Sequence, residues 1–280
     1  MSLHSVGTGR LTATVDSAGA QLRSLKFDGV EYLWNAGDPW NWSAPVLFPI
    51  ISGLPGGELQ HAGQRFPIPS HGFARHSEWA VMGDGLFELA ASEATRAQYP
   101  FDFRLQLEFA VADRLTVTHT VRNEGTEPLP YLLGGHPAFR WPLPGAIGEH
   151  TVTWSQGGET MRQAVGGLRP GRIPSPAVDG RLVLQKPYFA EDALLFDDLE
   201  PRAVSYSAPG AARVTMHYDD FAVLGIWSKA QGADFVCLEP WTGYPAPQGF
   251  DDDISTLPGI ELLAAGAERQ YRYSVTIEGA

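Results

Sequence analysis

Apolar and polar residues alternate along much of this chain of 280 residues, a pattern typical of β-strands with one buried face. The alternation is clearest at residues 103–111 and 115–121. Near the start, residues 10–15, 21–27 and 30–34 predict an antiparallel meander with short turns. Further strands are predicted at residues 151–154, 181–184, 213–218, 222–227, 234–239 and 269–277.

Many short strands separated by Gly, Pro and Asp turns, with few helix signals, predict an all-β fold. We expect a large antiparallel sandwich, with residues 1–280 as a single domain, because no domain boundary and no fixed-period repeat is visible. Two long segments, residues 36–75 and 136–148, are rich in Pro, Gly and Trp and are predicted to be packed loops. Loops of this length tend to be functional, and each of these contains or begins at a histidine.

The composition narrows the classes of function. The formal net charge is −12, and no cluster of basic residues is visible, which argues against a sequence-independent grip on nucleic acid. No apolar run approaches the roughly 20 residues of a membrane span, and no leader is visible, so we expect no membrane partner and a cytoplasmic location. The single cysteine, Cys237, forbids an intramolecular disulfide and fits a reducing compartment.

A carboxylate ends the predicted strand at residues 234–239. Glu239 shares one strand face with Phe235 and Cys237, and the other face is also apolar. A carboxylate buried there requires hydrogen-bond donors, a cation or a ligand, and desolvation would raise its pKa toward the range of a general base. A solvated glutamate or a structural ion pair is the alternative.

His136 follows two glycines and precedes a proline. Gly134 and Gly135 let the backbone turn tightly or approach a ligand closely, and Pro137 fixes the exit of the chain, so the imidazole is held in a defined direction. A histidine titrates near neutrality and suits proton donation. The alternative is a buried histidine that caps a turn.

The segment at residues 71–75 brings a histidine, an aromatic ring and an arginine within five positions. His71 and Arg75 can offer hydrogen bonds to a polar ligand, and Phe73 can offer a stacking face. The alternative is a surface turn whose arginine pairs with an acidic neighbour.

Other chemistries have little support in the sequence. Metal binding is a weak hypothesis because no H-E-x-x-H run and no paired cysteines occur, and neither a G-x-S-x-G elbow nor a phosphate loop is found. Cys237, inside an apolar strand, is expected to be inert packing. His119 shares a strand face with Leu115 and Val117 and is predicted to be a core histidine, whereas His217 is predicted to be solvated.

Aromatic residues make up 11% of the chain, and their faces suit stacking on the C–H faces of sugar rings. Most tryptophans are expected in the core, with one or two at most touching a ligand. The candidates beside the segments above are Trp34, Trp40, Trp42, Trp79, Trp141 and Trp241.

Five short motifs follow one another along the chain: W-N at 34–35, P-V-L-F-P at 45–49, H-G-F-A-R at 71–75, G-H-P-A-F at 135–139 and C-L-E-P-W at 237–241. In this order they resemble the aldose 1-epimerase family, also called galactose mutarotases, and more narrowly its bacterial branch with H-G-F-A-R. The resemblance runs from about residue 10 to the C-terminus. It implies a single-domain antiparallel β-supersandwich that interconverts the α and β anomers of an aldose with no cofactor and no metal.

The resemblance also implies a role for each candidate residue. Glu239 maps to the general base that acts on the C1 hydroxyl, and His136 maps to the general acid that acts on the ring oxygen. His71 matches the second family histidine, which binds near the ring oxygen. Substrate-binding candidates are Arg75, Phe73, Trp241 and Asp192, with Asp197 as an alternative aspartate in the same region.

One position departs from the family pattern. Relatives commonly carry an arginine in F-P-I-x-G-R, whereas this chain reads Ser52-Gly53-Leu54 after Ile51. The missing arginine leaves the identity of the sugar open and argues against a phosphate pocket, although Arg75 and Arg140 could partly replace it.

We therefore expect an isomerase that acts on a neutral monosaccharide, with a small-molecule sugar as its partner and a monomer or homodimer as its state. A non-catalytic sugar-binding or regulatory protein on the same fold and a hexose-6-phosphate 1-epimerase are the alternatives.

Overall fold

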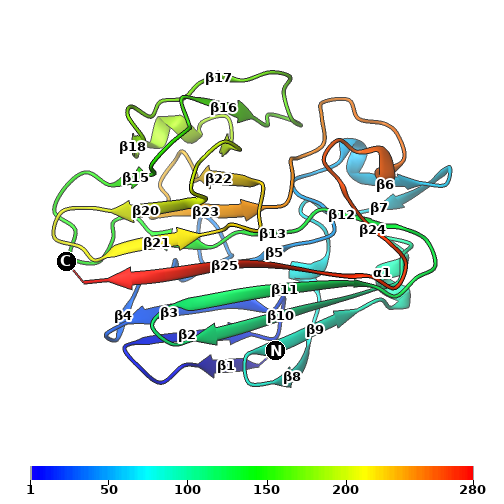
Figure 1. Cartoon of the computed structure of the whole chain (residues 1–280), viewed down its shortest axis with the longest axis horizontal. Coiled ribbons are helices and arrows are strands. Elements are labelled where there is room, and N and C mark those ends of the chain that lie inside the picture. Colours follow the sequence, from blue (N-terminus) through cyan, green and yellow to red (C-terminus); the bar gives the residue numbers. More distant parts are fainter. Residues whose placement is uncertain (1, 280) are drawn as a thin grey trace.

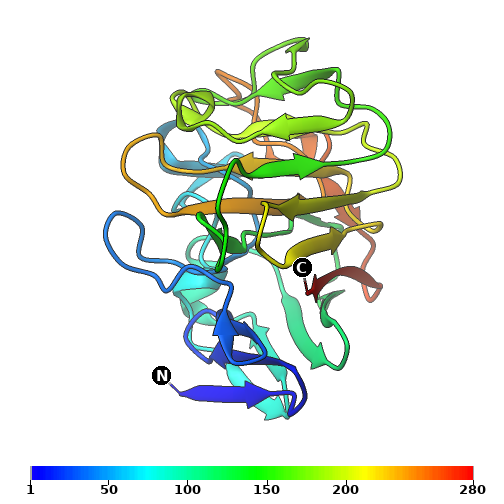
Figure 2. The same cartoon turned by 90° about the vertical axis from the view of Figure 1, so that its left-hand side faces the viewer.

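The computed structural model describes residues 2–279 and consists mostly of antiparallel β-sheet, which confirms the predicted all-β fold class (Figure 1). Two large sheets and a smaller N-terminal sheet make up the body of the fold. In Figure 2 the N-terminal strands, in blue, lie at the opposite end of the molecule from the yellow-green strands.

The larger sheet has nine strands and contains the longest strands of the protein. In spatial order they are β18 (Arg181–Val183), β15 (Thr151–Thr153), β20 (Ala203–Ser207), β21 (Arg213–His217), β25 (Glu268–Glu278), β11 (Leu115–Asn123), β10 (Phe103–Val111), β9 (Leu86–Ala90) and β8 (Ala80–Gly83).

The second sheet has eight strands, and most of them are short. In order they are β17 (Ile173–Pro174), β16 (Thr160–Gln163), β19 (Leu194–Phe196), β22 (Val223–Trp227), β23 (Phe235–Trp241), β13 (Gly134–Gly135) and β5 (Val46–Leu47), with β14 (Ala138–Arg140) also paired to β23.

The remaining elements are small. The N-terminal sheet consists of β1 (Leu3–Val6), β2 (Leu11–Asp16), β3 (Gln21–Phe27) and β4 (Val30–Glu31). Two short strand pairs are β6 (Glu58–His61) with β7 (Gln64–Pro67) and β12 (Leu129–Tyr131) with β24 (Glu261–Leu263). Within residues 2–279 the helical elements are one α-helical turn, α1 (Glu93–Arg96), and four 3₁₀ turns at Pro55–Gly57, Ala74–His76, Lys186–Phe189 and Ile254–Thr256.

The two strands with the clearest alternation are confirmed. β10 has the predicted bounds, β11 continues two residues further than predicted, and they pair with Leu105 opposite Val121. Both of these residues are fully buried, and β11 pairs on its other side with β25, so the three strands run side by side in Figure 1. The predicted N-terminal meander is also confirmed, with β1 added at its edge.

The strand predicted at residues 30–34 is shorter in the structure. Only Val30 and Glu31 pair with β3. The Glu31 carboxylate accepts a hydrogen bond from the backbone N–H of Leu33 at 3.0 Å, so this N–H is not available to extend the ladder. Leu33 instead forms an isolated bridge to Phe139.

The strand predicted at residues 234–239 is longer in the structure and begins one residue later. Pairing with β22 continues through Pro240 to Trp241, with Glu239 opposite Gly225. Glu239 therefore lies within β23 rather than at its end, and all seven residues of the strand are buried.

His119 is a core histidine, as predicted. Its side chain is 1% exposed, and its ring packs against those of Phe221 and Tyr273, with centroids 5.9 and 5.8 Å away. Burial lowers the pKa of His119 from 6.5 to about 4. The folded protein therefore keeps this imidazole neutral at pH values where the unfolded chain binds a proton.

This burial makes the fold sensitive to acid. The free energy of unfolding of the wild type, measured in urea, should be lower at pH 5 than at pH 7. Between pH 6.5 and about 4 His119 binds a proton in the unfolded chain but not in the folded protein, which favours unfolding. In His119→Leu the difference between the two pH values should be smaller by about 2 kcal/mol. The exposed His217→Leu should leave the difference unchanged, and an equal pH dependence in all three proteins would contradict this account.

Among residues 2–279 no helix has the length and the apolar character that crossing a membrane would need.

Candidate active site

A cavity of about 210 Å³ brings together most of the candidate residues. Strands β22 and β23 contribute to its wall, and so do both of the segments predicted to be functional loops. Its lining residues are Trp40, Ser52, Ser70, His71, Arg75, His136, Ala164, Asp192, Ala193, Trp227, Glu239, Trp241 and Pro245.

A larger hollow of about 580 Å³ lies elsewhere on the surface, between the exposed side chains of Arg181, Arg213 and Glu278. It brings no buried acid and base together, so the smaller cavity is the better candidate for chemistry.

Glu239 is the buried carboxylate of this cavity. It is 1% exposed, and neither of its oxygens completes a hydrogen bond with the described residues. The opposite position on β22 is Gly225, where a Cβ would lie 3.4 Å from the Cβ of Glu239 and 3.2 Å from the indole of Trp241. The absence of a side chain at Gly225 thus leaves room for both residues on this side of the sheet.

His136 lies in the chain between β13 and β14, and its Nε2 atom is 3.1 Å from Oε2 of Glu239. The two glycines before it do not form a free turn: they pair in the sheet at a point where side chains do not fit. A Cβ on Gly134 would lie 2.6 Å from the Trp241 ring, and one on Gly135 would lie 3.0 Å from Tyr273. Close packing of the backbone therefore fixes the direction of His136.

Aromatic rings hold the imidazole of His136 on two sides. The indole of Trp40 lies 5.0 Å away at 33°, and that of Trp227 lies 5.6 Å away at 89° between ring planes. His136 is only 6% exposed, and its Nδ1 atom completes no hydrogen bond with residues 2–279.

Burial shifts the pKa values of this pair in opposite directions. Desolvation raises the pKa of Glu239 well above 4.5, and the negative charge of Asp192 raises it further, while the Trp241 indole N–H opposes the shift. Desolvation lowers the pKa of His136 well below 6.5, and the positive charge of Arg75 contributes to this shift. Burial therefore favours states of the pair without net charge, in which the two groups share a single proton.

His71 is held by two hydrogen bonds to the same residue. The ring atom Nδ1 accepts a hydrogen bond from the backbone N–H of Ser52 at 3.0 Å. The backbone N–H of His71 donates to the Ser52 carbonyl at 2.8 Å. Burial, together with Arg75, lowers the pKa of His71 to about 3, so the ring is neutral. Because Nδ1 is the acceptor, Nε2 carries the ring proton and is a donor.

Local backbone geometry sets the position of His71. Its φ is +63°, and that of Gly72 is +72°. A Cβ on Gly72 would lie 2.1 Å from the carbonyl oxygen of Phe48, so only glycine fits there. The His71 ring lies edge-on to that of His136, with centroids 5.7 Å apart.

Arg75 lines the cavity as predicted, but Phe73 does not. The Arg75 guanidinium donates to the carbonyl of Ser70 at 2.7 Å and lies over the ring of Trp42 at 5.1 Å. Phe73 is 3% exposed, and its ring packs 5.9 Å from that of Phe103 in the core. The prediction that Phe73 stacks on a ligand is therefore wrong for this cavity, because its ring is packed in the core.

Asp192, rather than Asp197, lies at the mouth of the cavity. The residue is exposed, but its carboxylate is partly desolvated, which raises its pKa, and it accepts a hydrogen bond from the Ala193 N–H at 2.8 Å. Of the tryptophans considered above, Trp40 and Trp241 reach the cavity. Trp227, which had not been singled out, lines it as well.

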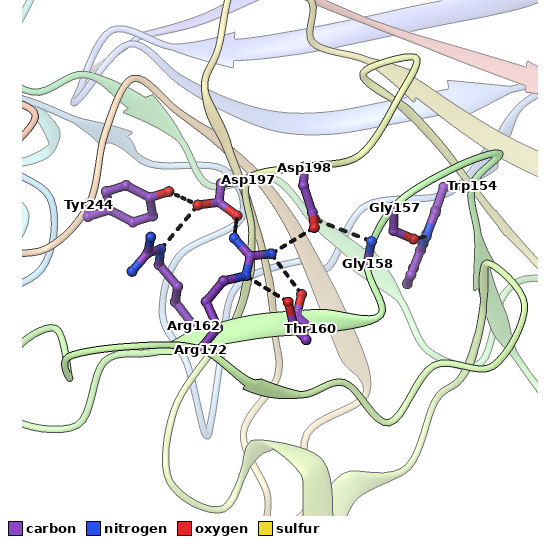
Figure 3. A network of polar contacts seen from close by, with 9 residues as sticks. All are labelled: Trp154, Gly157, Gly158, Thr160, Arg162, Arg172, Asp197, Asp198 and Tyr244. Atoms are coloured by element: carbon purple, nitrogen blue, oxygen red, sulfur yellow. Dashed lines mark hydrogen bonds and ion pairs between the residues drawn. The ribbon is translucent and has the colours of Figure 1, made fainter.

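Asp197 belongs instead to a polar network whose residues do not line the cavity (Figure 3). It accepts from Arg162 at 3.1 Å, from Arg172 and from the hydroxyl of Tyr244, and Arg172 also donates to Asp198 at 2.8 Å. The guanidiniums of this region are thus neutralised by carboxylates. Arg140 is exposed and does not line the cavity.

The chain matches the family model for aldose 1-epimerase over residues 2–248. It is 31% identical to the plasmid form of protein LacX from Lactococcus lactis subsp. lactis, over an alignment that covers 95% of this chain and 96% of LacX.

Two solved structures are similar to this one over their whole length. The galactose mutarotase related enzyme of Lactobacillus acidophilus has a TM-score of 0.91 and 26% identity, covering 99% of this chain and 98% of that one. The galactose mutarotase-like protein of Lactobacillus casei ATCC 334 also has a TM-score of 0.91 and 26% identity, covering 99% and 100%.

Proposed function

This chain belongs to the aldose 1-epimerase family, and we propose that it interconverts the α and β anomers of a neutral monosaccharide. The observation that carries the proposal is the pair formed by Glu239 and His136, with Nε2 and Oε2 3.1 Å apart at the wall of one cavity and Oε1 without a hydrogen bond to the described residues. Buried polar groups of this kind are stabilised by a polar ligand.

Ring opening requires two proton transfers. The Glu239 carboxylate removes the proton of the C1 hydroxyl while protonated His136 gives its proton to the ring oxygen. The electrons of the C1 O–H bond form the C=O bond of the aldehyde, and those of the bond between C1 and the ring oxygen stay on that oxygen. Glu239 ends as a carboxylic acid and His136 as a neutral imidazole.

Ring closure reverses these transfers after the aldehyde has rotated about the C1–C2 bond. The hydroxyl that was formed from the ring oxygen attacks C1 and gives its proton to His136. Glu239 returns its proton to the carbonyl oxygen. The pair carries one proton and no net charge before and after each step. After one opening and one closure both groups are back in their starting protonation states, so the pair catalyses exchange in both directions.

The neighbouring side chains suit a sugar ring. The Nε2 proton of His71 provides a donor for the ring oxygen or an adjacent hydroxyl, and Arg75 provides a second donor. The indoles of Trp40, Trp227 and Trp241 offer apolar faces for the C–H groups of the ring.

The charges of the cavity favour a neutral substrate over a phosphorylated one. Among the described lining residues, Glu239 and Asp192 are acids and Arg75 is the cation with a permanent charge. Arg162 and Arg172 are paired with carboxylates nearby. When F-P-I-x-G-R is set on residues 48–53, Gly53 stands where relatives commonly carry the arginine, and Gly53 does not line the cavity.

Polarimetry of freshly dissolved α-D-galactose and α-D-glucose tests the proposal. The rate of approach to equilibrium should rise in proportion to protein concentration for at least one neutral sugar and not for the 6-phosphates. Acceleration with a 6-phosphate alone would favour the phosphate epimerase, and binding of a neutral sugar without acceleration would favour a non-catalytic sugar-binding protein.

His71→Asn should weaken catalysis without unfolding the protein, since Asn tolerates the positive φ at this position. Loss of one donor to an oxygen that carries developing charge should lower kcat/KM by about 10-fold to 100-fold. The matched control is His217→Asn, on an exposed strand position. Equal kcat/KM in His71→Asn and wild type would show that His71 does not contact the reacting sugar.

A further inference from the structure

The one cysteine of the chain lies beside the acid and the base. A ring nitrogen of His136, Sγ of Cys237 and a carboxylate oxygen of Glu239 all lie within 4.8 Å of one another. The mechanism above gives no role to Cys237, which is fully buried.

The sheet itself creates this arrangement. Cys237 and Glu239 are two positions apart on β23 and share one face of the strand, while Ala138, two residues after His136, pairs directly with Cys237. Cys237 and Glu239 are thus held in a paired strand, and His136 lies in the two-residue link between β13 and β14, which both pair with that strand, so the three donors have a defined geometry.

Two of the three side chains are more than nine-tenths buried and contact each other as an ion pair, Nε2 of His136 to Oε2 of Glu239 at 3.1 Å. Beyond that contact, the Glu239 carboxylate and Nδ1 of His136 complete no hydrogen bond with the rest of the described chain. Both residues also line the cavity, through which a small ion can reach them. Unsatisfied buried donors and acceptors of this kind point to a ligand.

The set of sulfur, nitrogen and oxygen donors selects the type of ion. Thiolate and imidazole favour Zn²⁺ and Cd²⁺ over Mg²⁺ or Ca²⁺, which prefer oxygen. A point within about 2.8 Å of all three atoms exists for any separation up to 4.8 Å. Shifts of under about 1 Å would then reach zinc distances of roughly 2.0 to 2.3 Å, with the fourth position open to the cavity.

We propose that His136, Cys237 and Glu239 form a binding site for a thiophilic divalent cation, Zn²⁺ or Cd²⁺, and that its occupation inhibits the enzyme. An ion there would hold the carboxylate and the imidazole that move the protons, and it would also obstruct the sugar. The inhibition rests on the proposed function, whereas the binding does not.

Binding can be measured without any sugar. Because Cys237 is the sole cysteine, the ultraviolet charge-transfer absorption of a Cd²⁺–thiolate bond reports on this residue alone. Titration of the wild type with Cd²⁺ should give this absorption, saturating at one ion per chain, and Zn²⁺ should remove it by displacement. Cys237→Ser should abolish it, and Glu239→Gln and His136→Gln should each weaken Cd²⁺ binding at least about 10-fold.

Two results would overturn the site: no charge-transfer absorption in the wild type, or equal Cd²⁺ affinity in the wild type, Glu239→Gln and His136→Gln, which would mean binding by the thiol alone. Inhibition is tested by anomer exchange with and without Zn²⁺, each protein being compared with its own metal-free rate. Zn²⁺ should slow the wild type and require at least about 10-fold higher concentration in Cys237→Ser. A Cd²⁺ signal in a protein with no exchange activity would support the site and reject the proposed function.

Discussion

The Glu239→Gln variant should interconvert anomers between about 10² and 10⁴ times more slowly than the wild type, since it removes the general base. The amide has nearly the same shape as the carboxyl group but cannot accept the proton of the C1 hydroxyl. The fold should be preserved, with a melting temperature equal to or above that of the wild type, because a buried acid without hydrogen bonds is replaced by a neutral group. The rate is measured by polarimetry and the melting temperature by circular dichroism.

The matched control for this variant is Glu108→Gln. Glu108 lies on the exposed face of β10 in the nine-stranded sheet and does not line the cavity. It should exchange anomers at the wild-type rate. A Glu239→Gln protein that is folded, binds the sugar and retains more than about a tenth of the wild-type rate would show that Glu239 is not the base.

The His136→Gln variant should lose about 10² to 10³ in kcat, because the ring oxygen no longer receives a proton from a positioned acid. Gln can place its amide nitrogen near the position of Nε2, so packing against Trp40 is preserved better than with a smaller residue. The loss should appear in kcat more than in KM, since the transfer takes place in the transition state. Initial rates over a range of sugar concentrations separate the two.

The pH dependence of kcat/KM separates a loss of the general acid from a mere loss of structure. Wild-type kcat/KM should be bell-shaped: the acid limb should lie below pH 6.5, where a second proton binds to His136, and the alkaline limb above the usual carboxyl range, where the pair loses its proton. In His136→Gln the remaining activity should simply rise with pH as Glu239 ionises. An unchanged bell in the variant, or a loss equal to that of His217→Gln, would contradict the assignment.

The sequence contained enough information to select Glu239 and His136, which the structure brings together in one cavity. The apolar strand around Glu239 and the double glycine before His136 are strong local constraints, and each has a clear reason in the structure. Gly134 and Gly135 are required because Trp241 and Tyr273 lie within 3.0 Å of where a Cβ would be. The role of the two glycines was predicted only in part. They allow a close approach of the backbone, as expected, but to neighbouring side chains, and they lie in paired strands rather than in a tight turn.

Contacts between distant parts of the chain could not be predicted. Trp227 ends a correctly predicted strand, but its position beside the cavity depends on the register of β22 against β23, where it pairs with Cys237. Likewise β5 and β13 are strands of two residues each that pair across more than 80 positions, which is too short for any period to be visible. The pairing register is a property of the assembled sheet.

Phe73 and Asp192 show that the direction in which a side chain points, and not only its residue type, decides whether it lines the cavity. Both lie in regions that were selected correctly. Phe73 points into the core toward Phe48 and Tyr99, and Asp192 faces the cavity while Asp197 is held by arginines. Backbone angles such as the positive φ of His71 decide these directions, and composition does not reveal them.

The most direct test of the central claim is exchange between the α and β anomeric protons of an equilibrated aldose, measured by NMR magnetisation transfer with increasing amounts of wild-type protein. The account predicts an exchange rate that rises linearly with protein concentration and returns to the spontaneous rate when Glu239→Gln replaces the wild type. Sugar resonances that broaden or shift on binding, with an exchange rate equal to the spontaneous one, would contradict it.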